Sequence, residues 1–370
     1  MQTPIPLLHA GPACRPFLKT HPMNALESEL VYAFGDTLPE TGRCMQVAPG
    51  VYWLRMGLPF ALNHINLWLL EEEAGWTIVD CGIANEDTRA AWEEVFAQEL
   101  RGLPVLRVIA THCHPDHIGL AEWLCTRWQV PFYITLGEYG FARMLAAGLP
   151  GTDGAAMINF FRSHGLAQDK LAQLEGRKNH YQTLVPTVPA HFIRLEEATP
   201  LQIGQQTWRI ITGSGHSPEH AALYCESLGV MISGDMVLPR ISTNTSVFAV
   251  EPEADAVGNF LQSLKKFLPL PADTLILPSH GKPFRGLHAR IAQLTTHHAE
   301  RLAEVLAVCD TPKTAADIVP IMFTRELDMH QITFAMGEAL AHLHRLWYEG
   351  KLLRMVDEHA LTTFVRPPTA

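Results

Sequence analysis

Long apolar runs are missing from this sequence, and a basic leader segment is missing as well. Trp68–Leu70 runs directly into Glu71–Glu73, and no window approaches the roughly eighteen uninterrupted apolar residues of a membrane span. Pro4–Ala13 has no basic flank before it and contains three prolines, so it is a poor signal peptide. We therefore expect a soluble protein without a membrane partner, and Met23 is an alternative start.

Paired cysteines are also missing. The chain has seven cysteines, an odd number, and no two of them form a C-x-x-C pair. This pattern argues against a disulfide framework and against a structural zinc cluster built on cysteine. We therefore predict a reducing, cytoplasmic location.

Charge is scarce, and positive charge is in deficit. Charged residues make up 18% of the chain, and 28 Lys and Arg against 38 Asp and Glu give a net charge of −10. This balance opposes a general affinity for phosphate backbones. The 47% of hydrophobic residues excludes disordered and fibrous architectures. A length of 370 residues predicts roughly two domains at about 150 residues each.

Histidine, in contrast, is abundant and clustered. Of the 19 histidines, three fall within Thr111–His117, which reads T-H-C-H-P-D-H. The preceding segment Val105–Ala110 is short, apolar and rich in β-branched residues, as in a buried strand. The histidine cluster is therefore predicted at the carboxyl end of a strand.

The same arrangement recurs three times: Trp208–Ile211 leads to His216, Val230–Ile232 to Asp235, and Leu275–Leu277 to His280. Another run, Thr77–Val79, ends at Asp80, for which we favour a supporting role: its carboxylate would accept backbone donors beneath the site.

Imidazole and carboxylate donors in this number predict a transition-metal site, because seven donors exceed one tetrahedral shell. Zinc is the expected metal, with iron or manganese as alternatives. One metal would take three histidines, a second would take Asp116, His117 and His280, and Asp235 would bridge the two. The predicted ligands are His112, His114, Asp116, His117, His216, Asp235 and His280.

These residues resemble the metallo-β-lactamase superfamily of αββα hydrolases, whose H-x-H-x-D-H signature stands in full at His112–His117. The resemblance runs from about Gly50 through Gly281. Asn63–Asn66 resembles the family's early hairpin, and Asp80 its buried aspartate. Gly215–His220 resembles its G-H-[ST]-x-x-H segment, which implies a supporting place for His220 behind the ligands. Many relatives carry glycine where Glu219 stands. This difference is expected to change the rim of the pocket and to leave the ligand His216 unaffected.

Asp235 narrows the comparison, since true β-lactamases generally carry Cys or Ser at that position. The resemblance therefore implies a thioesterase similar to glyoxalase II, a lactonase, a phosphodiesterase or a ribonuclease. In such enzymes two cations activate a shared water. Asp116 is the predicted catalytic residue, orienting the hydroxide and passing a proton to the leaving group. A nucleophilic role for Cys113 is not needed.

Residues 138–199 form a predicted helical insertion. Apolar residues at helical spacing predict either a helix pair packed on the core or a lid that offers an apolar wall to an acyl chain. Predicted substrate contacts at its rim are Tyr139, Tyr181 and Asn244, the last within the polar run Ser242–Ser246.

Beyond His280 the pattern predicts a smaller α+β domain. Leu287–Cys309 predicts a long helix, Thr314–Asp317 a capping box before a second helix, and Asp328 the start of a third that ends near Tyr348. Lys351–Val365 predicts a hairpin. Helices followed by such a wing resemble a winged-helix domain, as in a ribonuclease branch of the superfamily. Residues 286–370 carry eight positive and ten negative side chains, which favours a packing or dimerisation module that braces the lid.

The sequence thus predicts an N-terminal extension over residues 1–45, an αββα hydrolase domain over 46–285, and a winged-helix-like domain over 286–370. We expect a binuclear metal hydrolase acting on a small acyl substrate, with a thioester or lactone preferred. The alternatives are an endoribonuclease or phosphodiesterase and, in a different class, a non-catalytic scaffold that binds partners. A homodimer is compatible with the pattern.

Overall fold

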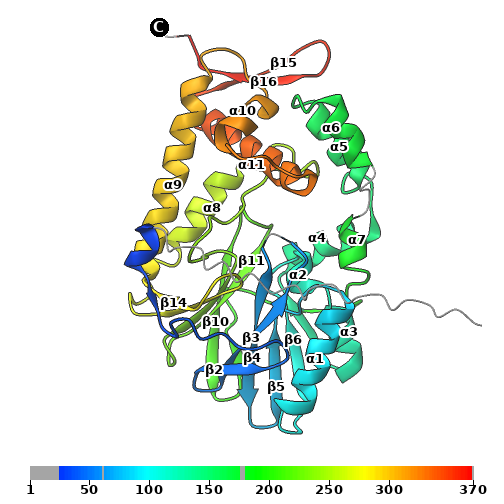
Figure 1. Ribbon diagram of the computed structural model, residues 1–370, viewed down its shortest axis with the longest axis vertical. Coiled ribbons are helices and arrows are strands. Elements are labelled where there is room, and N and C mark those ends of the chain that lie inside the picture. Colours follow the sequence, from blue (N-terminus) through cyan, green and yellow to red (C-terminus); the bar gives the residue numbers. More distant parts are fainter. Residues whose placement is uncertain (1–24, 61, 176–179, 369–370) are drawn as a thin grey trace, which may run out of the picture.

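The computed structural model describes residues 25–60, 62–175 and 180–368 (Figure 1). The sequence interpretations placed on Pro4–Ala13 and Met23 lie outside these residues. A seven-stranded sheet is formed first along the chain, with β2 to β5 antiparallel and β5 to β8 parallel. In spatial order its strands are β2 (Cys44–Ala48), β3 (Val51–Gly57), β4 (His64–Glu72), β5 (Gly75–Val79), β6 (Val105–Ile109), β7 (Phe132–Ile134) and β8 (Ile193–Arg194).

The second seven-stranded sheet is mainly antiparallel, with one parallel pair, β12 and β13. Its strands in spatial order are β1 (Val31–Tyr32), β14 (Phe284–Arg285), β13 (Leu275–Pro278), β12 (Val230–Gly234), β11 (His220–Cys225), β10 (Gln206–Gly213) and β9 (Leu201–Ile203). Every residue of β12 is buried, because one face meets the other sheet and the opposite face meets helices. This explains the continuous apolar run read from the sequence.

The two sheets pack face to face over a core that includes Trp53, Trp68, Ile232 and Leu277, all with no exposed surface. The outer face of the first sheet is covered by α1 (Glu86–Gln98), α2 (Pro115–Ile118) and α3 (Ala121–Trp128), and that of the second by α8 (Ala256–Lys265) and α9 (Leu287–Val308). The αββα fold predicted from the sequence is therefore confirmed.

The insertion contains four helices, α4 (Leu136–Ala147), α5 (Gly154–Arg162), α6 (Gln168–Glu175) and α7 (His180–Leu184). They divide between two cores. Ala142 of α4 packs in the core of the first sheet, whereas Ile158 and Phe161 of α5 and Leu171 of α6 pack with the C-terminal helices. The insertion therefore extends from the sandwich to the C-terminal region (Figure 1).

The C-terminal region contains α9, α10 (Ala315–Met322), α11 (Met329–Tyr348) and a hairpin of β15 (Leu353–Val356) and β16 (Thr362–Val365). Thr314 and Asp317 form the predicted capping box of α10, and Asp328 caps α11. Thr362 N donates to Ser163 O at 2.7 Å and Ala316 N to His164 O at 3.2 Å, so this region does brace the insertion.

The start of the described chain differs from the boundary expected at residue 46. The 3₁₀ helix η1 (Ala25–Glu29) leads to β1, which pairs with β14, and β2 begins at Cys44. Leu30 is buried in the core beneath the second sheet. The part of the 1–45 extension that the structure describes is thus integrated into the sandwich. No helix of the described residues is long and apolar enough to cross a membrane.

Candidate metal centre

Strand β6 delivers the first four donor residues. Its last residue, Ile109, is followed by a tight loop that carries His112 and His114, and α2 begins at Pro115. Proline suits the first helical position, because its ring presets the backbone angle and no N–H is needed there. This short helix carries Asp116 and His117, and the whole cluster follows the carboxyl end of β6, where the sequence placed it.

His216 reaches the site from the loop after β10. Gly215 has a φ of +102°, and a Cβ there would lie 2.3 Å from Ala256 O, so only glycine fits this turn. His216 Nδ1 donates to Asn244 O at 2.7 Å. Its Nε2 therefore carries the free lone pair and faces the other histidines.

Asp235 and His280 follow β12 and β13, the parallel pair of the second sheet, so both side chains arrive at the same edge. Asp235 N donates to His220 Nε2 at 3.1 Å, which places His220 behind the cluster rather than in it. His280 Nδ1 donates to His64 O at 2.8 Å, and its Nε2 points into the cluster.

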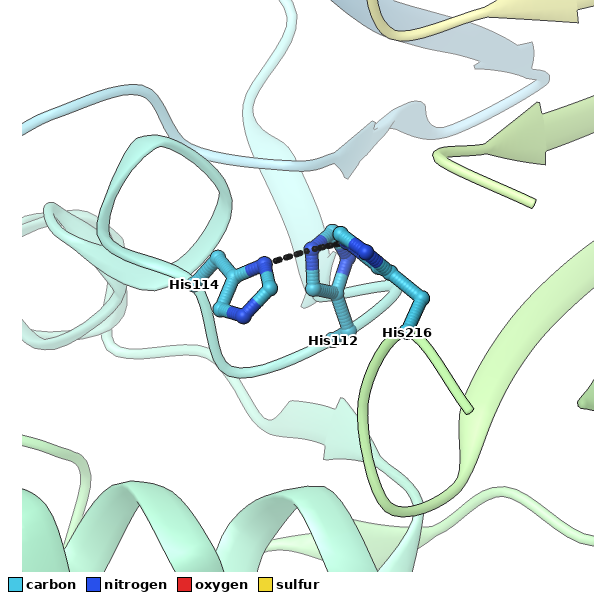
Figure 2. Close-up of side chains that lie close together, drawn as sticks. All are labelled: His112, His114 and His216. Atoms are coloured by element: carbon cyan, nitrogen blue, oxygen red, sulfur yellow. Dashed lines mark hydrogen bonds between the residues drawn. The ribbon is translucent and has the colours of Figure 1, made fainter. Parts of the chain in front are cut away.

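A first donor group consists of three imidazole nitrogens (Figure 2). His112 Nε2 lies 2.9 Å from His114 Nδ1 and 3.3 Å from His216 Nε2. Nitrogens bound to a tetrahedral zinc at about 2.0–2.1 Å lie about 3.3–3.4 Å apart. The spacing therefore fits one metal ion with an open fourth position.

A second donor group contains Asp116, His117 and His280. Asp116 Oδ2 lies 3.4 Å from His280 Nε2 and 3.8 Å from His117 Nε2. Asp235 stands between the groups, with Oδ2 3.4 Å from His216 Nε2 and Oδ1 3.6 Å from both His117 Nε2 and His280 Nε2. All seven predicted donors thus meet in one place.

The electrostatics of the two groups differ. Burial and neighbouring imidazoles lower the pKa of His112 far below its ordinary value and that of His114 to about 3, so both rings stay neutral. Burial also opposes charge on His117, but the nearby carboxylates outweigh it and raise its pKa to about 9. The pKa of Asp116 falls to about 2, because His117 and His280 overcome the effect of burial. The carboxylates thus make the second group the side of the centre that favours a positive charge.

Asp80 and Thr111 support the cluster from below. Asp80 Oδ1 accepts from Thr111 N at 2.7 Å, and Asp80 Oδ2 lies 2.8 Å from His117 Nδ1. The carboxylate thus fixes the imidazole ring so that Nε2 faces the other donors, an arrangement common behind metal-binding histidines. This is the supporting place that the sequence predicted for Asp80.

Two buried atoms in the centre have no hydrogen-bond partner among the described residues, His117 Nε2 and Asp235 Oδ1. Buried polar atoms are normally satisfied, and an imidazole nitrogen and a carboxylate oxygen that face each other at 3.6 Å without a hydrogen bond suit two ligands of one cation. The donor chemistry and these orphaned atoms together fit divalent metal ions.

Glu138 was missed by the sequence analysis as a site residue. Its fully buried carboxylate accepts from Cys113 N at 2.9 Å, Ser217 Oγ at 2.6 Å and Glu219 N at 2.7 Å. It therefore ties the loop of the first histidines to the loop of His216. Burial raises its pKa, although these donors lower it again in part. A lone Glu at the start of a helix gives no sequence signal for this role.

The three predicted substrate contacts lie in different settings. The Tyr139 hydroxyl donates to Pro189 O and Ala190 O within the insertion. The Tyr181 hydroxyl donates to Cys113 O at 2.6 Å, directly behind the metal loop. The side-chain amide of Asn244 donates to Glu338 of α11, while the backbone carbonyl of Asn244 accepts from His216 Nδ1. Substrate contact by these residues stays a prediction.

Two family models match this chain. Residues 62–280 match the family model "Metallo-beta-lactamase superfamily", and residues 302–367 match "Metallo-beta-lactamase-like, C-terminal domain". The chain is 23% identical over 319 residues to the probable metallo-hydrolase YqjP of Bacillus subtilis, covering 78% of this chain and 90% of that protein.

Two solved structures are similar over most of the chain. A beta-lactamase domain protein from Burkholderia ambifaria is 54% identical with a TM-score of 0.88, covering 93% of this chain and 100% of that one. A metallo-beta-lactamase family protein from Thermus thermophilus is 27% identical with a TM-score of 0.74, covering 87% of this chain and 100% of that one.

Proposed function

The chain belongs to the metallo-β-lactamase superfamily, and from this premise we propose that it is a binuclear metal-dependent hydrolase of a small thioester or lactone. The observation that carries the proposal is the convergence of seven nitrogen and oxygen donors from four strand ends, with two buried donor atoms left unpaired. The name of the Bacillus relative, a probable metallo-hydrolase, supports the same reaction class.

His112, His114 and His216 would hold one cation, Asp116, His117 and His280 the other, and Asp235 both. Two divalent cations held there would supply a lowered pKa for bound water and polarisation of the scissile carbonyl. Zinc suits this set of nitrogen and oxygen donors, and iron or manganese would also fit.

Asp116 would align the attacking water and transfer its proton. Its side chain is 19% exposed, while the other carboxylate of the centre, Asp235, is 10% exposed and held between the two groups. Asp116 can therefore reach an incoming substrate, align the attacking water by hydrogen bonding, and carry a proton from that water to the leaving group.

Charge around the C-terminal region supports a small substrate over RNA. Arg345 pairs with Asp255 and Glu349, Lys351 with Glu349, and Arg354 with Glu253. Basic side chains that are already paired offer little to a phosphate backbone, whose binding requires several uncompensated cations. We therefore place the ribonuclease function second, although the helices and hairpin of this region resemble a winged helix.

The decisive experiment combines metal analysis with a substrate panel. Purified protein should hold about two metal ions per chain, and EDTA should remove both the metal and the activity. Metal-replete protein should hydrolyse at least one acyl thioester or lactone but not short single-stranded RNA. A stoichiometry of one in active protein, unchanged by added metal, would refute the two-metal site. EDTA-sensitive RNA cleavage without thioesterase or lactonase activity would instead establish the ribonuclease, and no hydrolysis with metal bound would favour a scaffold.

A further inference from the structure

A pocket of about 400 Å³ lies beside the metal centre, on the side of the first sheet. Its wall includes Pro39 from the segment before β2, Arg55 and Gly57 from β3, and Asn63 and His64 from the start of β4. None of the predicted metal ligands lines it. The pocket is therefore a separate space whose relation to the centre depends on the residues between them.

His64 is the link between the pocket and the metal centre. Its backbone carbonyl accepts from Nδ1 of the ligand His280, and the two rings lie 6.2 Å apart between centroids. Its Nε2 accepts from Gly281 N at 2.9 Å, so its Nδ1 carries the proton and donates to Asn63 Oδ1. The His64 ring is thus fixed as a neutral wall, with the pocket on one side and His280 on the other.

Arg55 is the only Lys or Arg among the described residues that line the pocket. Strand alternation places Arg55 on the same face of β3 as Trp53, which points between the sheets. Its cross-strand neighbour on β4 is Asn66. It lies near the strand end, so its guanidinium is half-buried where the sandwich opens.

The guanidinium of Arg55 makes no hydrogen bond or ion pair with any residue that the structure describes. Burial lowers its pKa, and its charge helps to lower the pKa of the neighbouring His64. A half-buried cation without a counter-charge is unfavourable, and an anion that forms paired N–H···O bonds with the guanidinium fork relieves the penalty. Glu40 also lines the pocket but is exposed and makes no ion pair with Arg55.

We propose that Arg55 binds an anionic oxygen group of the substrate, a carboxylate or a phosphate, in the pocket beyond His64 while the scissile carbonyl lies at the metal centre. This inference rests on the proposed hydrolase function and narrows its substrate class to acyl compounds that carry a negative charge at one end. Arg55 is then a specificity-determining residue, and neutral acyl compounds are poorer substrates.

The kinetic test uses matched thioesters in two arms. S-Adipoyl-N-acetylcysteamine against S-hexanoyl-N-acetylcysteamine places a carboxylate on the acyl end, and S-hexanoyl-phosphopantetheine against S-hexanoyl-pantetheine places a phosphate on the thiol end. Metal-replete wild type should prefer the anionic member of one pair by about tenfold or more in kcat/KM, the scale of a charge-assisted hydrogen bond. The pair that shows the preference tells whether Arg55 binds a carboxylate on the acyl end or a phosphate on the thiol end.

Two substitutions and one control read out the role of Arg55. Arg55→Gln should reduce the preference to about one while changing kcat/KM for the neutral thioester by less than about twofold. Arg55→Lys should retain part of it, since an ammonium keeps the charge but lacks the fork. Arg209→Gln, on an exposed arginine of the other sheet, should behave as wild type. A preference that survives Arg55→Gln, or no preference in either arm, overturns the proposal.

A binding measurement separates this proposal from the hydrolase function. Calorimetric titration of adipate and of inorganic phosphate into full-length, metal-replete protein should show binding that weakens about tenfold or more in Arg55→Gln and not in Arg209→Gln. If no thioester is hydrolysed, the proposed function fails, and this titration still decides the anion site. Anion binding that is unchanged in Arg55→Gln, or absent from wild type, overturns it.

Discussion

Glu138→Gln is the most informative single substitution, because it removes one charge and almost no volume from beneath the metal loops. Oε1 of Glu138 accepts from Ser217 Oγ and Glu219 N, and Oε2 accepts from Cys113 N. A carboxylate is an acceptor on both oxygens, whereas an amide presents one oxygen and one NH₂ group. Whichever way the amide turns, one of the two backbone N–H groups faces another donor.

The expected cost follows from that mismatch. One hydrogen bond to a charged group is lost and a buried N–H is left unsatisfied, which together destabilise the fold by about 1–3 kcal/mol. Neutralising a buried carboxylate whose pKa is raised by burial offsets part of this cost. Loosening the loops of His112 and His216 should also weaken metal binding by about 10- to 100-fold, as for residues that orient metal ligands.

Both effects can be measured with the same protein preparations. Urea unfolding of the metal-free form gives the stability loss, and competition with a calibrated chelator gives the metal affinity. Glu226→Gln, at an exposed turn of the second sheet, is the matched control and should change neither quantity. Wild-type metal affinity and stability in Glu138→Gln would show that the carboxylate does not hold the loops.

Three further predictions address the proton carrier Asp116, the contact of Glu338 with Asn244, and two basic residues in and before the C-terminal hairpin. Asp116→Asn should keep the fold and lower kcat by at least about a hundredfold on any thioester the wild type hydrolyses, and near-wild-type turnover would exclude the assigned role. Burial raises the pKa of Glu338 to about 7, so the folded state holds an extra proton between about pH 4.5 and 7 and loses stability as pH rises through that window. The free energy of urea unfolding of Glu338→Gln should lack this decline, and parallel plots of unfolding free energy against pH for wild type and variant would contradict the prediction. Lys351→Ala combined with Arg354→Ala should leave thioester turnover within about twofold at low and physiological salt, since both side chains form exposed ion pairs, and a steep salt dependence would point to a polyanionic substrate.

The sequence was most informative where chemistry follows a strand directly. His112, His216, Asp235 and His280 each stand a few residues beyond a short apolar run, and such runs form central strands whose ends meet at one edge. Local signals were also sufficient for the C-terminal helices, because the capping boxes at Thr314 and Asp328 mark their starts.

Contacts between distant segments could not be predicted in this way. Glu138 joins two loops that are about a hundred residues apart, and the sequence around it reads only as the start of a helix. Asn244 was expected at the substrate rim for its polar side chain, yet the contact that reaches the centre is its backbone carbonyl, which every residue has. Arg55 occupies an ordinary strand position, and its lack of a partner is visible only in three dimensions.

The orientation of the ligands therefore depends on acceptors from other parts of the chain. His117, His216 and His280 each direct Nδ1 toward an oxygen, supplied by Asp80, Asn244 and His64 respectively. In each ring this contact turns Nε2 toward the centre. The loop that carries Asn244 is in turn held by α11, through Val247 N to Gly337 O at 3.1 Å and the Asn244 amide to Glu338. A change in the C-terminal helices can thus reach His216 through Asn244 without contacting substrate or metal.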